Sequence, residues 1–437
     1  MNTRNTNDQS AASDATLNRR QLLTAICAGV GASLVTDSHR LVHAAPVSAP
    51  VNDDAPWRQV KEAFAFEPGY IALNAANLCP TSAPVFEAQL QIMRDVNRDP
   101  SFENRARFEA EKEKTRARLA NMLGADADEI AITRNTSEGN ATIIDGLKLG
   151  PGDEVVVWDQ NHESNLVAWR VAAKRRGFTV TTVTTPAQPR DQQQLIAPFE
   201  KALKRQTRVI AFSHIANMSG TRAPAQALCA LARERGVLSL LDGAQSFGML
   251  AVDLHAIGCD FYTGSAHKWL AGPRECGVLY VRKDALDRVW PHMVTHAWSD
   301  ERERSARKFD CLGQQDDGRI VALGSAVEFH ERIGCASVQD RIISLNTSLK
   351  EKLAARVAGV QLLTPVPPAL SAGITCFTVP NPDGEKIRQI LYGTHRISAL
   401  SVPAGGRTLL RFCPHIYTLP EEIDRAVAAV AAVAAAA

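Results

Sequence analysis

Five polar residues in two short segments could together hold and activate an aromatic aldehyde. Asp242 and Gln245 lie in one four-residue segment, and Lys268 closes a second segment that contains Ser265 and His267. A lysine amine can form a Schiff base with a carbonyl, a carboxylate can keep a ring nitrogen protonated, and an amide can hydrogen-bond a phenolic oxygen. These are the groups that pyridoxal 5′-phosphate (PLP) requires. We therefore expect a PLP site built on Lys268, Asp242 and Gln245.

A phosphate group needs a separate set of donors. Thr136 and Ser137 follow the short apolar run 130–132 and open a segment with helical character that runs to about residue 148. Hydroxyl groups and free backbone N–H groups at a helix start suit a phosphate dianion. An ordinary helix cap is the alternative for this motif by itself. Ser265 and His267 would add donors on the other side.

Two further residues complete the expected site. His162 follows the predicted strand Glu154 to Trp158 and begins the next helix, where an imidazole can stack on a pyridine ring and relay protons. Arg411 lies near the C-terminus, and its planar guanidinium can bind a carboxylate through two parallel hydrogen bonds. Taken singly, a helix cap and an edge-strand arginine are the ordinary interpretations.

Alternating helical and β-rich patterns between about residues 105 and 290 predict an α/β fold. Several strand candidates are apolar at every position, as in strands that are covered by helices on both faces of a mostly parallel sheet. Ligands are then expected at the carboxyl ends of the strands. The expected strands are Glu154 to Trp158, Thr179 to Thr184, Arg208 to Phe212, Val237 to Leu241, Phe261 to Thr263 and Gly277 to Val281. The expected helices are Arg107 to Met122, Ser164 to Arg176 and Pro224 to Arg235.

The pattern divides the chain into four parts. Residues 81–310 are the expected large domain, and 311–437 a smaller domain with helices at about 320–333 and 339–357 and a final helix from Glu421. Residues 46–80 are expected to pack on the small domain through a short strand at Tyr70 to Asn74. The alanine-rich end, from Arg425 to Ala437, has high helix propensity but few side chains that could pack, so we expect its tip to fray.

Residues 1–45 have the pattern of an export signal. Arg19 and Arg20 precede a mostly apolar run of about 14 residues, and small residues follow at 42–45. A helix of that length is too short to span a bilayer, which takes about 20 residues. The pattern predicts a twin-arginine signal, cleavage after Ala44 or Ala45, and a periplasmic or secreted protein without a stable membrane anchor.

Composition excludes several classes of partner. The formal net charge is only +2, with 49 basic and 47 acidic residues, so nothing favours nucleic acid or an anionic membrane. The nine cysteines are scattered without a Cys-x-x-Cys pair, which is typical of buried small side chains rather than of metal ligands. We expect a small-molecule partner and no metal.

These residues resemble the class V aminotransferase family of fold-type I PLP enzymes, which includes cysteine desulfurases, selenocysteine lyases and isopenicillin N epimerase-like proteins. The resemblance spans about residues 68–430 and rests on six segments in the family's order. They are 70–74, 136–140, 162–165, 242–245, 265–268 and 411–424. It implies a large domain with a mostly parallel, seven-stranded-type sheet between helices, a smaller α+β C-terminal domain, and a homodimer.

The resemblance also implies a role for each matching residue. Lys268 would form the Schiff base and move the Cα proton, Asp242 would pair with the ring nitrogen, and Gln245 would contact the phenolic oxygen. His162 would stack on the ring, and Arg411 would bind the substrate carboxylate, with Asn74 nearby. The phosphate would be held by Thr136, Ser137, Ser265 and His267.

Two departures from the family pattern narrow the function. Cysteine desulfurases carry a nucleophilic cysteine shortly after an arginine that corresponds to Arg396, whereas this chain has no cysteine between Arg396 and Cys413. Where many relatives have a Gly-Thr that reaches the partner's phosphate, this chain has Gly313 and Gln314, so Gln314 is the candidate replacement. The first departure argues against persulfide chemistry, and the surroundings of Gln314 look closer to the isopenicillin N epimerase-like branch.

The sequence therefore predicts an exported PLP enzyme that acts at the Cα of an amino acid or amine, as a transaminase or an epimerase. Two alternatives stay open. One is a C–S or β-elimination lyase without the persulfide cysteine, and the other is a PLP-binding protein without turnover. No Gly-x-Gly-x-x-Gly segment opens a helix, which argues against a Rossmann dehydrogenase.

Overall fold

The computed structural model describes residues 54–380 and 383–435. The predicted twin-arginine leader at residues 1–45 lies outside the described residues. No helix in the described part of the chain combines the length and the apolar character needed to cross a membrane.

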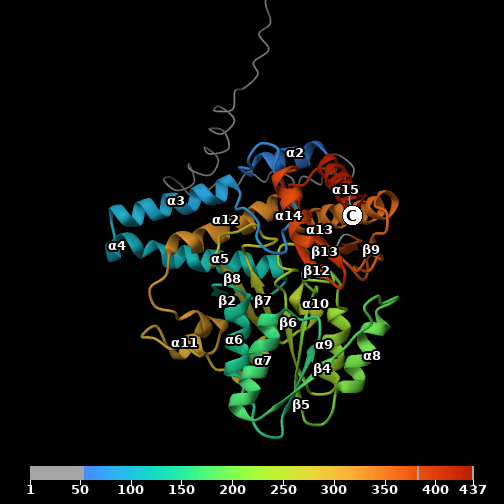
Figure 1. The fold of residues 1–437 in the computed structure, drawn as a ribbon. Coiled ribbons are helices and arrows are strands. Elements are labelled where there is room, and N and C mark those ends of the chain that lie inside the picture. Colours follow the sequence, from blue (N-terminus) through green and yellow to red (C-terminus); the bar gives the residue numbers. More distant parts are fainter. Residues whose placement is uncertain (1–53, 381–382, 436–437) are drawn as a thin grey trace, which may run out of the picture. The chain divides into compact units, whose positions relative to one another are not determined.

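A seven-stranded sheet forms the centre of the fold, in the order β2-β8-β7-β6-β5-β3-β4 (Figure 1). Only β8 runs antiparallel to its neighbours; the other neighbouring pairs are parallel. The strands are β2 (Ile130–Thr133), β3 (Glu154–Trp158), β4 (Thr179–Val183), β5 (Thr207–Ser213), β6 (Leu238–Asp242), β7 (Phe261–Ser265) and β8 (Gly277–Val281). The mostly parallel, seven-stranded α/β sheet expected from the sequence is thereby confirmed.

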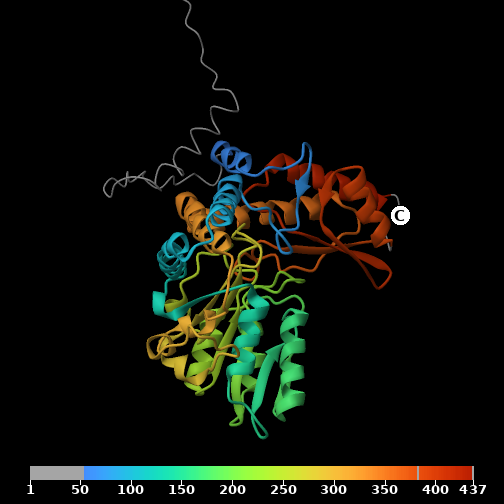
Figure 2. The same cartoon turned by 90° about the vertical axis from the view of Figure 1, so that its left-hand side faces the viewer.

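Apart from the edge strand β4, both faces of this sheet are buried, and successive strand residues alternate between two apolar cores. In β3, Val156 and Trp158 join one core, while Val155 and Val157 join the other. The first core is covered by α5 (Arg107–Leu123), α8 (Gln193–Ala202) and α9 (Ala225–Glu234), and the second by α6 (Thr136–Gly146) and α7 (Glu163–Arg176). Figure 2 shows α6 and α7 side by side against the sheet. Because side chains on both faces of such a strand are buried, every residue along it tends to be apolar.

The helix boundaries follow from local chemistry. The side chain of Asn135 caps α6 by accepting from Glu138 N at 3.0 Å, and that of His162 caps α7 by accepting from Ser164 N. α7 ends at Gly177, whose φ of 82° is favoured by glycine. The predicted helices agree with α5, α7 and α9 to within one residue at each end.

A second layer of helices lies beside the first core. α12 (Asp317–Ile333) packs against α3 (Ala83–Arg98) and α5, as Figure 1 shows. Gly324 of α12 permits this contact, because a Cβ there would lie 2.6 Å from Thr115 Oγ1 of α5. The remaining short helices are α4 (Phe102–Arg105), α10 (Leu254–Ile257), α11 (Asp300–Glu303), η2 (Ala127–Glu129), η3 (Lys283–Arg288) and η4 (Ala306–Asp310).

The C-terminal part has its own sheet and core. Four antiparallel strands run in the order β12-β13-β10-β9, with bounds Leu400–Ala404, Arg407–Phe412, Thr375–Val379 and Gln361–Leu362. Three helices accompany them: α13 (Cys335–Arg356), α14 (Gly384–Gly393) and α15 (Pro420–Ala435). A separate apolar cluster joins α13, α14 and α15 to β10 and β13.

The N-terminal described segment pairs with C-terminal residues. β1 (Ile71–Ala72) runs parallel to β11 (Ile397–Ser398), and Asn74 forms a bridge with Cys413. Ahead of them, α2 (Ala55–Glu62) places Arg58 in an ion pair with Glu421 of α15. The described residues all belong to one compact unit, so the divisions at residues 80 and 310 stay predictions.

The alanine-rich end packs as far as Ala434, contrary to the expectation that few of its side chains could pack, and residues 436–437 at its tip lie outside the described residues. Val427, Val430 and Val433 of α15 are buried in the cluster that contains Leu345 and Leu349 of α13. One valine in every three or four residues is sufficient to mark a buried helix face. The alanine-rich composition suggested that the segment had few side chains to pack, and the regular spacing of its valines was overlooked for that reason.

We therefore expect Val430→Asp to lower the free energy of unfolding by about 3 kcal/mol, because an unpaired carboxylate would enter an apolar core. The matched variant Ala432→Asp introduces the same charge on the exposed face of α15. It should change stability by no more than about 0.5 kcal/mol. Thermal denaturation followed by circular dichroism measures both, and equal losses would show that α15 is not held by this face.

Candidate functional site

Most of the predicted site residues converge at the carboxyl edge of the large sheet. Asp242 is the last residue of β6 and Ser265 the last of β7, while Thr136 begins α6 after β2 and His162 caps α7 after β3. Lys268 follows β7 by three residues. Carboxyl ends of parallel strands share one edge of a sheet, so distant sequence segments meet there.

The residues predicted to bind the phosphate lie on two segments that are joined by hydrogen bonds. Thr136 N donates to Ser265 Oγ at 2.9 Å, and the two hydroxyl oxygens are also 2.9 Å apart. Ser137 is exposed at the start of α6, and His267 is half-buried. The first backbone N–H groups of a helix lack intrahelical partners, so this end of α6 can bind a phosphate.

Gly139 makes this arrangement sterically feasible, and our sequence reasoning assigned it no role. A Cβ at this position would lie 2.8 Å from Thr263 Cγ2 on β7. Because glycine has no Cβ, α6 can pack closely on β7, which brings Thr136 next to Ser265.

Asp242 is 4% exposed and is held by two neutral donors. Asn140 Nδ2 donates to Oδ2 at 2.9 Å, and Ala244 N donates to Oδ1 at 3.0 Å. Thr263 Oγ1 in turn donates to Asn140 Oδ1 at 3.0 Å, which fixes the amide orientation. Among the described residues, Asp242 has no ion pair. A buried carboxylate in this setting is suited to a cationic ligand group such as a protonated pyridine nitrogen. Asn140 was in the motif that we noted, but its role was missed.

Lys268 is half-buried, and within the described parts of the chain its Nζ has no hydrogen bond or ion pair. Burial lowers the pKa of Lys268; the negative charge of Asp242 opposes this shift, and the positive charge of Arg411 adds to it. The amine is therefore more readily deprotonated than an exposed lysine, as a Schiff-base lysine requires.

The two histidines are kept largely neutral. The pKa of His162 is lowered by burial and then by the charge of Lys268, and the same two causes lower the pKa of His267. His162 Nδ1 accepts from Ser164 N at 3.2 Å, which orients its ring. An uncharged imidazole can stack on a cationic ring without repulsion.

Arg411 and Asn74, the two predicted substrate residues, contact each other. Arg411 Nη2 donates to Asn74 Oδ1 at 3.0 Å, and Nη1 donates to the backbone oxygen of Asn217 at 2.8 Å. Arg411 is 5% exposed, its Nε is buried without a partner, and no carboxylate among the described residues pairs with it. Asn217 lies in the turn after β5 and carried no sequence signal, since its backbone oxygen makes the contact.

Gln245 is 3% exposed and already makes two hydrogen bonds. Its Nε2 donates to Ala76 O at 3.1 Å, and its Oε1 accepts from Trp269 Nε1 at 2.7 Å. One N–H of the amide is left for a ligand. Trp269, next to Lys268, was not predicted as part of the site.

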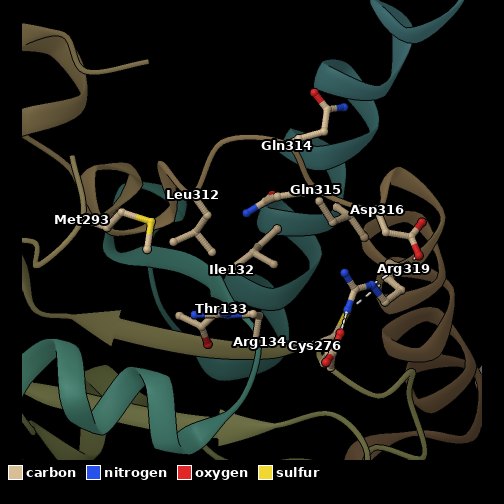
Figure 3. Close-up of a pocket in the computed structure, with 12 residues that line it drawn as sticks. Ile132, Thr133, Arg134, Cys276, Met293, Leu312, Gln314, Gln315, Asp316 and Arg319 are labelled. Carbon is tan, nitrogen blue, oxygen red and sulfur yellow. Dashed lines mark hydrogen bonds and ion pairs between the residues drawn. The ribbon is translucent and has the colours of Figure 1, made fainter. Parts of the chain in front are cut away.

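Gln314 lies apart from this cluster within one chain. It lines a cavity of about 260 Å³ together with Arg134, Glu275, Asp316 and Arg319 (Figure 3). None of the other predicted cofactor residues lines that cavity. In the orientation that satisfies its amide, the Gln314 oxygen accepts from Arg105 Nη1 at 2.6 Å.

The donor set as a whole fits PLP: a carboxylate held for a ring nitrogen, an unpaired amine, hydroxyls at a helix start, and an amide N–H. Sequence comparison gives the same answer, since residues 80–422 match the aminotransferase class-V family model. The chain belongs to the class V aminotransferase family. Together with PLP-bound structural neighbours, membership implies PLP as the cofactor.

Isopenicillin N epimerase of Amycolatopsis lactamdurans is 30% identical over 385 residues, covering 84% of this chain and 96% of that protein. A probable cysteine desulfurase of Methanothermobacter thermautotrophicus is 28% identical, covering 81% and 92%. Among solved structures, a mutant of C-DES with glycine covalently linked to its PLP cofactor is 25% identical, with a TM-score of 0.77 and coverage of 85% and 98%. This class V enzyme is thus similar to both epimerases and desulfurases.

The lowered pKa of Lys268 leads to a pH prediction. PLP capture by the apoprotein needs the neutral amine, so its rate should rise with pH and level off below the ordinary lysine value of about 10.4. Arg411→Gln removes a positive charge that lowers this pKa, so the rise should move to higher pH. Arg407→Gln on the same strand should leave the profile unchanged. Stopped-flow absorbance measures the rates, and identical profiles for the two variants would contradict the assignment.

Proposed function

We propose that this enzyme moves a proton at the Cα of an amino acid, as an epimerase or a transaminase. The observation that carries the proposal is Arg411, a buried cation without an anionic partner among the described residues, whose charge also acts on Lys268. Burying an unpaired charge is costly, and a substrate carboxylate would compensate for it.

Each residue then has a defined task. Arg411 and Asn74 bind and orient the substrate carboxylate, which places Cα within reach of Lys268. Lys268 takes and returns the Cα proton, and Asp242 keeps the ring nitrogen of the cofactor protonated. When bound, PLP supplies an electron sink for the charge that develops at Cα. Thr136, Ser137, Ser265 and His267 hold its phosphate, and His162 covers its ring.

Persulfide chemistry is not favoured. No cysteine follows Arg396 before Cys413, and the two cysteines whose charges act on Lys268 are both buried. Burial raises the pKa of Cys79 to about 12 and also raises that of Cys413, so both stay thiols rather than nucleophilic thiolates. This supports the epimerase-like branch over a desulfurase.

A C–S lyase is the second candidate. It is supported by the resemblance to a solved complex of the cystine C-S lyase C-DES with cysteine persulfide, which is 26% identical with a TM-score of 0.75 and covers 83% of this chain and 97% of that one. Such a reaction would use the same first step at Cα.

Isotope exchange separates these reactions. We expect the purified holoenzyme, incubated in D₂O with a panel of L-amino acids, to replace the Cα hydrogen with deuterium. A D-isomer indicates epimerisation, a keto-acid-dependent product indicates transamination, and pyruvate with sulfide indicates the lyase. Lys268→Ala should abolish exchange. A PLP-loaded enzyme that exchanges no amino acid would refute the proposal and leave a binding protein without turnover.

Substrate affinity tests the carboxylate site separately. Arg411→Gln should raise KM by about 10- to 100-fold, because charge-assisted hydrogen bonds to the carboxylate are lost. Arg407→Gln, whose guanidinium contacts Thr378 and Gly359 instead, is the matched control and should leave KM unchanged. Equal KM values for both variants would rule out Arg411 as the carboxylate ligand.

We further propose that the enzyme is a homodimer. Exposed apolar side chains on α3, on α4 and in the segment 290–294 offer surface for a second copy: Phe86, Met93, Phe102, Trp290 and Val294. Because Arg105 engages the Gln314 oxygen, the amide N–H groups of Gln314 remain to donate to the partner's phosphate. Light scattering of the purified protein gives the oligomeric state, and a monomeric mass would refute this proposal.

Export through the twin-arginine pathway is proposed from Arg19, Arg20 and the apolar run that follows them. This route carries folded proteins, which suits an enzyme that binds its cofactor in the cytoplasm. Replacing both arginines by lysine should retain the precursor in the cytoplasm of a bacterial host. Unchanged fractionation would contradict the export proposal.

A further inference from the structure

The amide of Gln245 is fixed in one orientation by two contacts of opposite kind. Trp269 Nε1 can only donate, and it donates to Oε1; Ala76 O can only accept, and it accepts from Nε2. Rotating the amide by 180° would set N–H against N–H and carbonyl against carbonyl. All three groups are buried, so water does not compensate for a wrong orientation.

Trp269 is itself held by an aromatic stack. Its ring lies 5.4 Å from that of His415 at 17°, and His415 lies 4.9 Å from Tyr417 at 9°. His415 Nε2 donates to Trp269 O at 2.9 Å, while its Nδ1 accepts from Ile416 N at 2.7 Å, which sets the tautomer. Burial lowers the pKa of His415 to about 3, so the ring stays neutral.

We propose that Trp269 is a positioning residue whose indole N–H fixes the Gln245 amide, so that an N–H rather than the carbonyl is presented to the phenolic oxygen of PLP. This inference rests on the proposed function, because it needs PLP in the site. Without the indole N–H, the Gln245 oxygen loses its partner and only the contact with Ala76 O still orients the amide, so its N–H is held less firmly against the phenolic oxygen. His415 of the same stack also donates to the backbone oxygen of Trp269, the residue that follows Lys268.

The test is the pH dependence of the visible absorbance of the PLP-loaded protein. Donation to the phenolic oxygen stabilises the form with more negative charge there, which is the deprotonated chromophore. Trp269→Phe keeps a ring in the stack but deletes the N–H, so the midpoint of the absorbance change should rise by about one pH unit, the size expected for one hydrogen bond. Gln245→Met should cause a similar rise.

Tyr417→Phe is the matched control. It removes a hydroxyl from the same stack, but that hydroxyl contacts Cys79 Sγ at 3.5 Å and not Gln245. The midpoint of this variant should equal that of the wild type. The double variant Trp269→Phe/Gln245→Met should shift no further than Gln245→Met, since both changes remove the same hydrogen bond.

An unchanged midpoint in Trp269→Phe, or additive shifts in the double variant, would overturn the inference while leaving PLP binding intact. A wild-type protein that develops no visible band with PLP would instead refute the proposed function. If Trp269→Phe does not fold, 3-benzothienylalanine at position 269 replaces it, because that side chain keeps the indole shape and lacks only the N–H. It should give the same rise, and an unchanged midpoint contradicts the inference.

Discussion

Burial of both faces of the central sheet is the constraint on which the rest of the structure depends. A parallel strand covered by helices on both sides can carry almost no polar side chains along its length, and β3 shows this by sending alternate residues into two apolar cores. Polar chemistry is thereby confined to the strand ends. At the carboxyl edge, β6 and β7 deliver Asp242, Ser265 and the loop of Lys268 to one place.

Three charged side chains of the candidate site, those of Asp242, Lys268 and Arg411, have no ion-pair partner among the described residues. Asp242 is held by neutral donors. Burial, and after it the nearby positive charges, lowers the pKa of Lys268, His162 and His267, which favours a neutral amine and neutral imidazoles. The unbalanced charges match a ligand that brings a protonated ring, a phosphate and a carboxylate.

Sequence alone predicted the strands of the large sheet and several helices, and it singled out residues that the structure brings to one edge of that sheet, because both depend on local pattern. Strands at 154–158 and 277–281 have the predicted bounds, and the motif residues lie at the expected strand ends. What could not be predicted depends on contacts between distant segments. Gly139 matters because α6 packs closely on Thr263 of β7. Asn217 takes part only through its backbone oxygen, which accepts from Arg411. Trp269 takes part by donating a hydrogen bond to Gln245. The packing of α15 was missed because alanine-rich composition obscured its valine face.

The hydrogen bond between Asn74 and Arg411 joins residues 337 positions apart, and β1 pairs with β11 across a similar interval. Asn74 and β1 therefore cannot meet their partners until residues 397–411 have been synthesised, however early the central sheet assembles. A fragment that stops before Arg411 would contain Thr136, Asp242 and Lys268 but would lack the cation that we propose as the ligand of the substrate carboxylate. In such a fragment, cofactor binding and substrate binding would become separable properties.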